Sequence, residues 1–444
     1  MAAPRTASRT ASRPASRPAS RSGSRQSSRP ASRPSSRAVA SPGAVRPERL
    51  LAAVVLALVC FGLVMVFSTS STTALLNDGD PMGLAIRQAA YALVGLGAYA
   101  VFVRMSPEGM KRLGPPAIGV CIFLLLVVLV PSIGTQVNGS RRWISLGGLG
   151  AIQPSEIAKL ALALWIAQAV VRRPSSLRTG KGLVPFLGVT GVLAFLILIE
   201  PDMETAVIAV ITAFVMLLVA GARTRHLGGI VGVGVLIATI GILAEPYRRA
   251  RILSFIDPWS DPDGVGFQSV QAQVALGSGG LHGVGLGDGV QKAFYLPEAH
   301  TDMILATIGE ELGLIGVLAV LAAYGLFAVA GYRIALGARN LHQQVLAAGL
   351  TTMVVMQAAV NVGAVVGVMP VTGVPLPFVS FGGSNLITFL ACTGILVNIG
   401  RRSHTHARGL SVVDGGEGRD RGRGDGRARD AGAGGGRRAA RAGG

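Results

Sequence analysis

Residues 50–69 read LLAAVVLALVCFGLVMVFST, a run without a single charged side chain. A helix needs about 20 mostly apolar residues to cross the hydrocarbon core of a bilayer, and this run has that length. It is too long for a cleavable signal and lacks a small-residue cleavage site. The run therefore predicts a first transmembrane helix.

Nine further apolar runs follow along the chain. Half of the 444 residues are hydrophobic and only 14% are charged, which is too few charges for an ordinary soluble surface. We therefore predict an all-α polytopic membrane protein with ten transmembrane helices. The predicted spans lie near residues 50–69, 84–103, 116–133, 157–171, 183–199, 205–221, 228–244, 303–331, 344–368 and 385–399.

Basic residues in short loops mark the cytoplasmic side of a membrane protein. Here they collect in every second loop, as Arg104, Lys111 and Arg112, then Arg172, Arg173, Arg178 and Lys181, then Arg223 and Arg225, then Arg333 and Arg339. The alternation predicts that both termini are cytoplasmic. It also predicts a large extracytoplasmic loop, about residues 245–301, between the seventh and eighth helices.

The two ends of the chain differ in composition from the middle. Residues 1–47 are rich in Arg, Ser and Pro, with an arginine at every fourth position from Arg5 to Arg37, and residues 403–444 are rich in Gly and Arg. We predict that both are disordered cytoplasmic tails around a membrane domain at 48–402. The basic tail suits contact with anionic membrane lipids or a partner, and an inert solvated tail is the alternative. We expect no nucleic acid partner, because aromatic residues for stacking are missing.

Cys60, Cys121 and Cys392 all fall inside predicted spans. We expect three free, buried thiols and no disulfide framework.

Asp302 ends the large external loop, immediately before the eighth predicted helix. A carboxylate at the membrane rim, shielded from bulk water, can hold its proton more tightly and act as a general base. Asp is also well suited to cap the N-terminus of a helix. On these residues alone, both interpretations stay open.

The same loop carries Arg248, Arg251 and Lys292, with a glycine-rich stretch at 277–289. Guanidinium groups suit phosphate oxygens, and glycines let backbone amides approach a ligand. The arginines could instead pair with aspartates of the loop or reach lipid phosphates. Nucleotides are scarce outside the cytoplasm, so a lipid-linked diphosphate sugar fits as an activated donor. Its leaving group needs cations, and the acceptor hydroxyl needs a base.

Arg141, Arg142 and Trp143 form a second polar group in an earlier external loop, which leads to Glu156 and Lys159. Glu156 and Lys159 are three residues apart and share one helix face. Charged groups inside a membrane cost about 3 kcal/mol each, so we expect a structural ion pair that faces the bundle interior. A substrate role is the alternative.

Acidic residues gather at two more places. Glu200, Asp202 and Glu204 crowd the outer end of the fifth predicted helix, where a divalent cation or a hydrogen-bond network would fit. Glu310 and Glu311 lie two to three turns inside the eighth helix, at a depth unsuited to direct contact with a sugar. No cofactor follows from the sequence with certainty, and the metal requirement is left open.

Residues 295–313, YLPEAHTDMILATIGEELG, resemble a motif of the SEDS family of peptidoglycan glycosyltransferases. Further similar strings are NGSRRWISLGG (138–148), QPSEIAKLA (153–161), RILSFIDPW (251–259), GLGDGVQK (285–292) and NVGAVVGVMPVTGVPLPFVSFGGSN (361–385). The similarity spans residues 48–402 and looks closest to the branch of the family that acts in cell division.

The resemblance implies a polymerase that joins lipid II disaccharide units into glycan strands on the outer membrane face. Asp302, the last residue of the PEAHTD motif, is then the essential carboxylate, which activates the acceptor sugar's 4-hydroxyl. Glu298 and His300 of the same motif are then candidate substrate-binding residues.

With this reading, Arg248, Arg251 and Lys292 become candidates to bind the diphosphate, and Arg141 and its neighbours Arg142 and Trp143 line the mouth of the site. The resemblance also implies a class B penicillin-binding transpeptidase and other division proteins as partners, at the septum of the cell membrane.

Two competing functions remain on the sequence: a lipid II flippase and a scaffold for division partners. The concentration of polar motifs on the external side favours a fixed catalytic site over transport. One departure from the family pattern is Glu204, which replaces a glycine in the string EPDMETA (200–206). An added carboxylate there would repel a diphosphate or alter a cation site.

Overall fold

The computed structural model describes residues 45–76, 80–137, 140–147, 150–229, 231–232, 234 and 255–417. Within this part of the chain, eight helices are long and apolar enough to cross a membrane. They are α1 (Pro47–Leu76), α2 (Gly83–Arg104), α3 (Pro107–Val128), α4 (Pro154–Arg172), α5 (Gly180–Ile199), α11 (Ile304–Leu336), α12 (Leu341–Val365) and α13 (Gly383–Glu417). A shorter apolar helix, α6 (Met203–Val219), packs against α4, α5 and α12.

These helices coincide with nine of the ten predicted spans, and the protein is a polytopic, almost entirely helical membrane protein. The remaining predicted span, 228–244, lies largely outside the described residues, so the number ten stays a prediction. The third span begins earlier than predicted, at Pro107, where Ser106 caps the helix by accepting from Gly109 N at 3.1 Å. Lys111 lies before the apolar run from which the span was predicted, but the helix already includes it.

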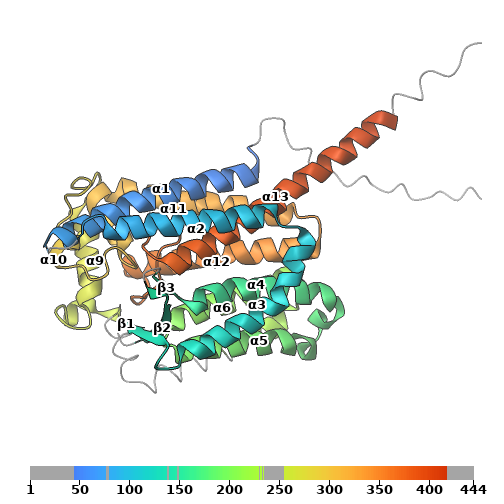
Figure 1. Ribbon diagram of the computed structural model, residues 1–444, viewed down its shortest axis with the longest axis horizontal. Coiled ribbons are helices and arrows are strands. Elements are labelled where there is room, and N and C mark those ends of the chain that lie inside the picture. Colours follow the sequence, from blue (N-terminus) through green and yellow to red (C-terminus); the bar gives the residue numbers. More distant parts are fainter. Residues whose placement is uncertain are drawn as a thin grey trace, which may run out of the picture. The chain divides into compact units, whose positions relative to one another are not determined.

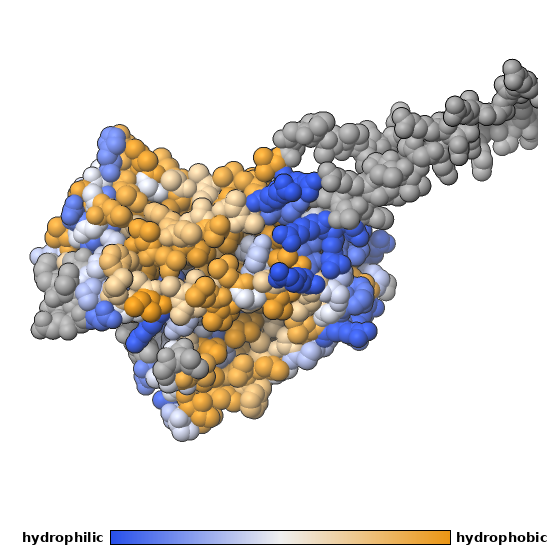
Figure 2. All heavy atoms as spheres, turned by 45° about the horizontal axis from the view of Figure 1, so that its top comes forward, coloured by the Kyte–Doolittle hydropathy of each residue, from blue (hydrophilic) through white to orange (hydrophobic). Residues whose placement is uncertain are grey.

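The helices differ in how deeply they lie in the bundle. In α13, 94% of the most apolar window is buried, and in α4 and α12 78% is buried, against 17% in α2. The apolar surface of α2 therefore faces lipid, while α13 lies among α1, α2, α4 and α12. Figure 2 shows hydrophobic residues over the middle of one face, with hydrophilic residues gathered toward its ends.

A three-stranded antiparallel sheet follows α3, and the sequence analysis did not predict it. Its strands are β1 (Gly134–Val137), β2 (Ser140–Ser145) and β3 (Ala151–Ile152), in the order β1-β2-β3. The missed signal was Asn-Gly at 138–139, a dipeptide typical of tight hairpins. The sheet lies at the same end of the bundle as α9 (Phe267–Ser278) and α10 (Gln291–Phe294), as Figure 1 shows.

Helix α11 is broken at Gly313, whose backbone has φ 66° and ψ −166°. The external loop supplies hydrogen-bond partners for main-chain groups at the break. Leu314 N donates to Gly280 O at 3.0 Å, and Val284 N donates to Glu310 O at 3.0 Å. Unpaired backbone groups within a membrane cost several kcal/mol each, which explains why a loop packs against this helix. The loop before α11 is thereby fixed to the membrane bundle.

Helix α13 continues beyond residue 402, where the sequence analysis placed the end of the membrane domain. The boundaries at 1–47, 48–402 and 403–444 stay predictions, and residues 1–44 and 418–444 lie outside the described part. All three cysteines are free, as expected, but only Cys121 and Cys392 are buried. Cys60 is exposed on the outer surface of α1, so the expectation that it is buried was wrong.

Candidate active site

Asp302 lies two residues before the first residue of α11 and is 7% exposed. Its main-chain carbonyl accepts a hydrogen bond of 2.7 Å from Nδ2 of Asn361 on α12, and its Oδ1 accepts one of 3.2 Å from Thr301. The cap position of α11 is occupied by Met303, which makes no side-chain capping bond. Asn361 thus fixes the main chain of Asp302, and Asp302 is not the N-cap residue of α11.

The other motif residues lie in the same tight turn. Glu298 is exposed with φ 56°, and its Oε2 accepts from Thr301 Oγ1 at 3.0 Å. The ring of His300 lies 5.7 Å from the ring of Phe381, and its carbonyl accepts from Phe381 N at 2.9 Å. Burial lowers the pKa of His300 against the opposing effect of Glu298. The imidazole is therefore neutral at pH 7.

Glu156 and Lys159 make contact inside the bundle, as their spacing predicts. Lys159 Nζ lies 2.9 Å from Glu156 Oε1, and both side chains are almost wholly buried. Gln357 Oε1 accepts from Lys159 Nζ at 2.6 Å, and Asn385 donates to Glu156 Oε2 at 3.0 Å. These amides satisfy two charges that would otherwise be unpaired in a low-dielectric interior.

Gln357 connects this ion pair to the surroundings of Asp302. It stands four residues before Asn361, so both amides lie on one face of α12. Gln357 donates to Pro375 O at 3.0 Å, and Asn361 donates to Val374 O at 2.9 Å. The loop after α12 is thus held between the ion pair and the Asp302 turn.

The three predicted mouth residues follow one another on strand β2, at an irregularity in its pairing with β1. Trp143 pairs with Thr135 and Arg141 pairs with Gln136, so Arg142 is an extra residue between them with no partner of its own on β1, as in a β-bulge. Arg142 Nη1 lies 4.0 Å from Asp202 Oδ1, and Arg142 also donates to Ser140 at 2.9 Å. Strand β2 therefore brings Arg142 to the acidic corner.

Asp202 is the centre of a hydrogen-bond network at that corner. Its Oδ2 accepts from Gln153 at 3.0 Å and from Ser155 at 3.2 Å, and its Oδ1 accepts from Thr205 N. Glu200 is fully buried nearby, and neither of its carboxyl oxygens has a hydrogen-bond partner among the described residues. Burial, reinforced by Asp202, raises the pKa of Glu200 to about 9 despite the opposing effect of Arg142.

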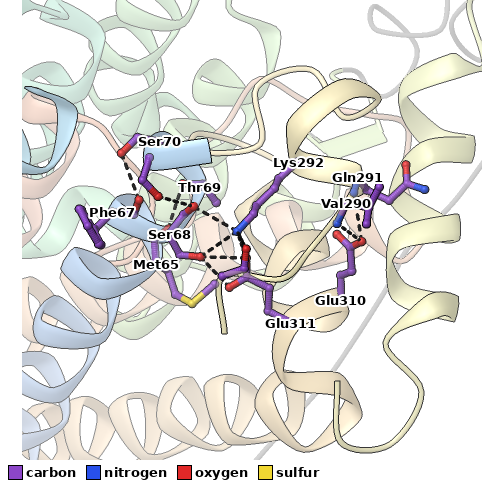
Figure 3. Close-up of polar contacts among 12 residues, drawn as sticks. Met65, Phe67, Ser68, Thr69, Ser70, Val290, Gln291, Lys292, Glu310 and Glu311 are labelled. Carbon is purple, nitrogen blue, oxygen red and sulfur yellow. Dashed lines mark hydrogen bonds and ion pairs between the residues drawn. The ribbon is translucent and has the colours of Figure 1, made fainter. Parts of the chain in front are cut away.

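Lys292 is buried in an ion pair with Glu311, and Figure 3 shows both side chains meeting beside Ser68. Lys292 Nζ also donates to Ser68 Oγ at 3.0 Å and to Gly287 O at 2.8 Å. Ser68 Oγ donates to Glu311 at 2.8 Å. This geometry gives no support to the predicted diphosphate role of Lys292, which stays a prediction.

Glu310 binds main-chain N–H groups at the start of α10. Its Oε1 accepts from Val290 N at 2.8 Å and from Gln291 N at 3.0 Å (Figure 3). Glu310 and Glu311 therefore both bind the external loop to α11, and the expectation that they lie too deep for the sugar stays a prediction.

Some predicted groups are not brought together in the structure. Arg248 and Arg251 lie outside the described residues, so their diphosphate role stays a prediction. In the part of the chain that is described, no three His, Cys, Asp or Glu side chains gather as metal ligands. Glu204 is half-buried in the first turn of α6.

The sequence analysis did not predict a role at the site for three buried amides, Gln357, Asn361 and Asn385. A signal was present, because amides inside apolar helices are uncommon and mark either structural networks or sites.

A bundle of membrane-crossing helices with buried ionisable side chains at one end defines a polytopic membrane protein with an internal polar site. A family model for cell cycle proteins, that of FtsW, RodA and SpoVE, matches residues 48–405. The chain belongs to this family, and the resemblance seen in its motifs is confirmed.

Two curated relatives illustrate the similarity. The probable peptidoglycan glycosyltransferase FtsW of Geobacter metallireducens is 40% identical over 347 residues, covering 78% of this chain and 92% of the relative. The stage V sporulation protein E of Bacillus subtilis is 40% identical over 362 residues, covering 80% and 98%.

Solved structures agree with this assignment. A chain from a peptidoglycan synthase complex that coordinates polymerization and crosslinking matches with a TM-score of 0.66 and 32% identity, covering 80% of this chain and 97% of that one. The rod shape determining protein RodA of Thermus thermophilus matches with a TM-score of 0.58 and 30% identity, covering 79% and 95%.

Proposed function

We propose that this protein is a glycosyltransferase that joins lipid II disaccharide units into glycan strands at the outer face of the cell membrane. The observation that carries the proposal is Asp302, a buried carboxylate at the start of α11 whose main chain is fixed by Asn361. Relatives named peptidoglycan glycosyltransferase support the class of reaction.

Asp302 supplies the base that glycosyl transfer needs. Its carboxylate takes the proton of the acceptor sugar's 4-hydroxyl while that oxygen attacks the anomeric carbon of the donor. The new C–O bond forms, the bond from that carbon to the diphosphate oxygen breaks, and the lipid diphosphate leaves with the electron pair. Attack opposite the leaving group inverts the donor and gives a β-linked glycan.

Cations must stabilise the diphosphate as it leaves. We assign this role to Arg248 and Arg251, with Arg141, Arg142 and Trp143 at the mouth of the site. Lys292 takes a different role in this proposal, because its ammonium group is already buried against Glu311. It anchors the external loop to α11 and α1.

We further propose that the enzyme works at the division septum with a class B penicillin-binding transpeptidase and other division proteins. The similarity to a chain of a complex that coordinates polymerization with crosslinking supports such a partner. Relatives named FtsW support the division branch, although a sporulation protein has the same identity to this chain.

A lipid II flippase is the second candidate, and one observation favours it. Helix α11 is interrupted at Gly313, and two acidic residues, Glu310 and Glu311, lie three and two residues before the break. Interrupted membrane helices with ionisable groups are common in transporters. Here, however, Glu310 and Glu311 are engaged by the external loop, which leaves them poorly placed to carry a substrate across.

Polymerisation of purified lipid II tests the proposal directly. The protein would be reconstituted with its transpeptidase partner, beside Asp302→Asn and a control, Asp80→Asn, which changes an exposed aspartate in the same way. Loss of a base should lower the rate by at least about 100-fold in Asp302→Asn and leave Asp80→Asn active. Equal polymer from both variants would remove Asp302 from the mechanism. Absence of polymer in all three, with lipid II transfer between leaflets intact, would favour the flippase.

A further inference from the structure

A cavity of about 460 Å³ lies between α3, α4 and α5, at the ends of these helices where basic residues gather. It is lined on α4 by Trp165, Gln168 and Arg172, on α5 by Phe186 and Gly188, and on α3 by Pro115. Its volume is that of a small-molecule binding site.

The cavity is separate from the candidate active site. Glu156 stands in the first turn of α4 and Arg172 in the last, and at 1.5 Å per residue they are about 24 Å apart along the helix. Arg172, Arg178 and Lys181 belong to one of the basic loops, so the positive-inside rule places this end at the cytoplasmic leaflet.

One stripe of α4 builds the polar side of the cavity. Trp165, Gln168 and Arg172 are spaced by three and four residues and share a helix face. Gln168 is 7% exposed, and neither its amide nor the Arg172 guanidinium has a hydrogen-bond or ion-pair partner among the described residues. The amide of Gln168 lines the cavity and offers a ligand there both a donor and an acceptor.

The other walls are apolar. Trp165 and Phe186 meet edge to face with ring centroids 5.9 Å apart. Gly188 leaves room beside them, because a Cβ at this position would meet nothing within 4 Å. The lining contains two arginines, Arg172 and Arg173, and no acidic residue.

We propose that this cavity binds an anionic membrane phospholipid from the cytoplasmic leaflet. The phosphate lies at the arginines, the glycerol ester oxygens reach the Gln168 amide, and an acyl chain lies along Trp165 and Phe186. Charge complementarity selects the occupant, because anionic lipids are enriched at this leaflet and each nearby arginine contributes to their attraction. A soluble anion would contact the arginines but would leave the apolar walls of the cavity without a contact.

Lipid binding by the purified full-length protein tests the proposal. Native mass spectrometry with dioleoyl-phosphatidylglycerol and dioleoyl-phosphatidylcholine would give the apparent Kd of each lipid. We expect the anionic lipid to bind at least about fivefold more tightly than the zwitterionic one. Equal binding of the two lipids, or displacement of the bound lipid by inorganic phosphate, would overturn the proposal.

Two matched pairs of variants locate the site. Gly188→Leu fills the cavity, whereas Gly191→Leu adds the same side chain to open space on the same helix outside it. Arg172→Gln removes a lining charge, whereas Arg178→Gln removes an exposed charge of the same loop. The first member of each pair should weaken phosphatidylglycerol binding at least about fivefold, and the second less than about twofold. Equal effects within both pairs would show general surface attraction and overturn the site. If one lining variant fails to fold, judged by its thermal midpoint, the other pair decides.

Discussion

Asn361 donates from one amide nitrogen to the main-chain carbonyls of Asp302 and Val374, at 2.7 and 2.9 Å. The main chain of Asp302 is therefore held by a side chain of α12 that does not need to touch substrate. Since a displacement of about 1 Å in a reacting group can lower a rate about 100-fold, this bond has a consequence for activity.

Asn361→Leu should lower the rate of lipid II polymerisation by about 10- to 100-fold, because the Asp302 turn loses its anchor. The matched control is Asn398→Leu, which removes another buried amide that donates to main-chain carbonyls, including Phe102 and Met105. Both variants should lose stability to a similar extent. A rate loss in proportion to stability in both variants would argue against a positioning role for Asn361.

Lys292 and Glu311 give a second prediction, because breaking a buried ion pair leaves one uncompensated charge. Lys292→Met and Glu311→Gln should each destabilise the protein by about 3–5 kcal/mol, and the double variant should lose much less than the sum. Thermal unfolding in detergent measures all three variants.

The same two single variants and their double variant also separate the anchoring role of Lys292 from a role in binding the diphosphate. If Lys292 bound the diphosphate, Lys292→Met would raise the KM for lipid II, and adding Glu311→Gln would not restore it. Recovery of both stability and KM in the double variant is the outcome expected of an anchor.

Gly283 gives a third prediction, at the junction of the external loop with the broken helix. It has φ 82°, and a Cβ there would come within 2.1 Å of Glu311 O. Gly283→Ala should therefore separate the loop from α11 and lower the thermal midpoint. Gly280→Ala is the control: Gly280 also has positive φ, at 53°, but a Cβ there meets nothing within 4 Å. Equal losses in the two variants would mean that backbone strain alone, about 1 kcal/mol, explains the effect.

Much of the fold followed from the sequence because apolar length and helix period are local properties. The run at 50–69 needed no knowledge of its neighbours to be recognised as a helix. The pairing of Glu156 with Lys159 was also local, since their spacing on one helix determines it. The sheet at β1–β3 was accessible too, through the Asn-Gly dipeptide of the sequence, but a search for apolar runs passes over short strands.

The partners of Lys292 could not be predicted, because they come from positions far apart in the chain. Ser68 precedes it by more than 200 residues, and Glu311 lies on α11 just before the break at Gly313, where the loop packs. Only the tertiary packing reveals that this cation is buried rather than free for a substrate. The same holds for Asn361, whose bond to Asp302 joins α12 to the turn before α11.

Glu200 supplies a prediction for pH. Its pKa is about 9 in the folded protein, and the ordinary value is 4.5. Between these values the folded state holds a proton that the unfolded state releases, so this residue lowers the stability of the folded state as pH rises through that window. Glu200→Gln keeps nearly the shape of the protonated carboxyl group, but the amide does not ionise in this pH range. The thermal midpoint of Glu200→Gln minus that of the native protein should therefore grow between pH 5 and pH 9, by at least about 3 °C.

Asp263→Asn provides the control for this series, because it replaces an exposed acid of the external loop by its amide. Its midpoint difference from the native protein should stay constant across the same pH range. A constant difference for Glu200→Gln as well would mean that the carboxyl is ionised in the folded protein. Since no described side chain bonds to it, the charge would then have to be balanced by Arg142 or by a bound cation. Repeating the series with a chelator and with added Mg²⁺ separates these two cases, because only a bound cation makes the native midpoint depend on the metal.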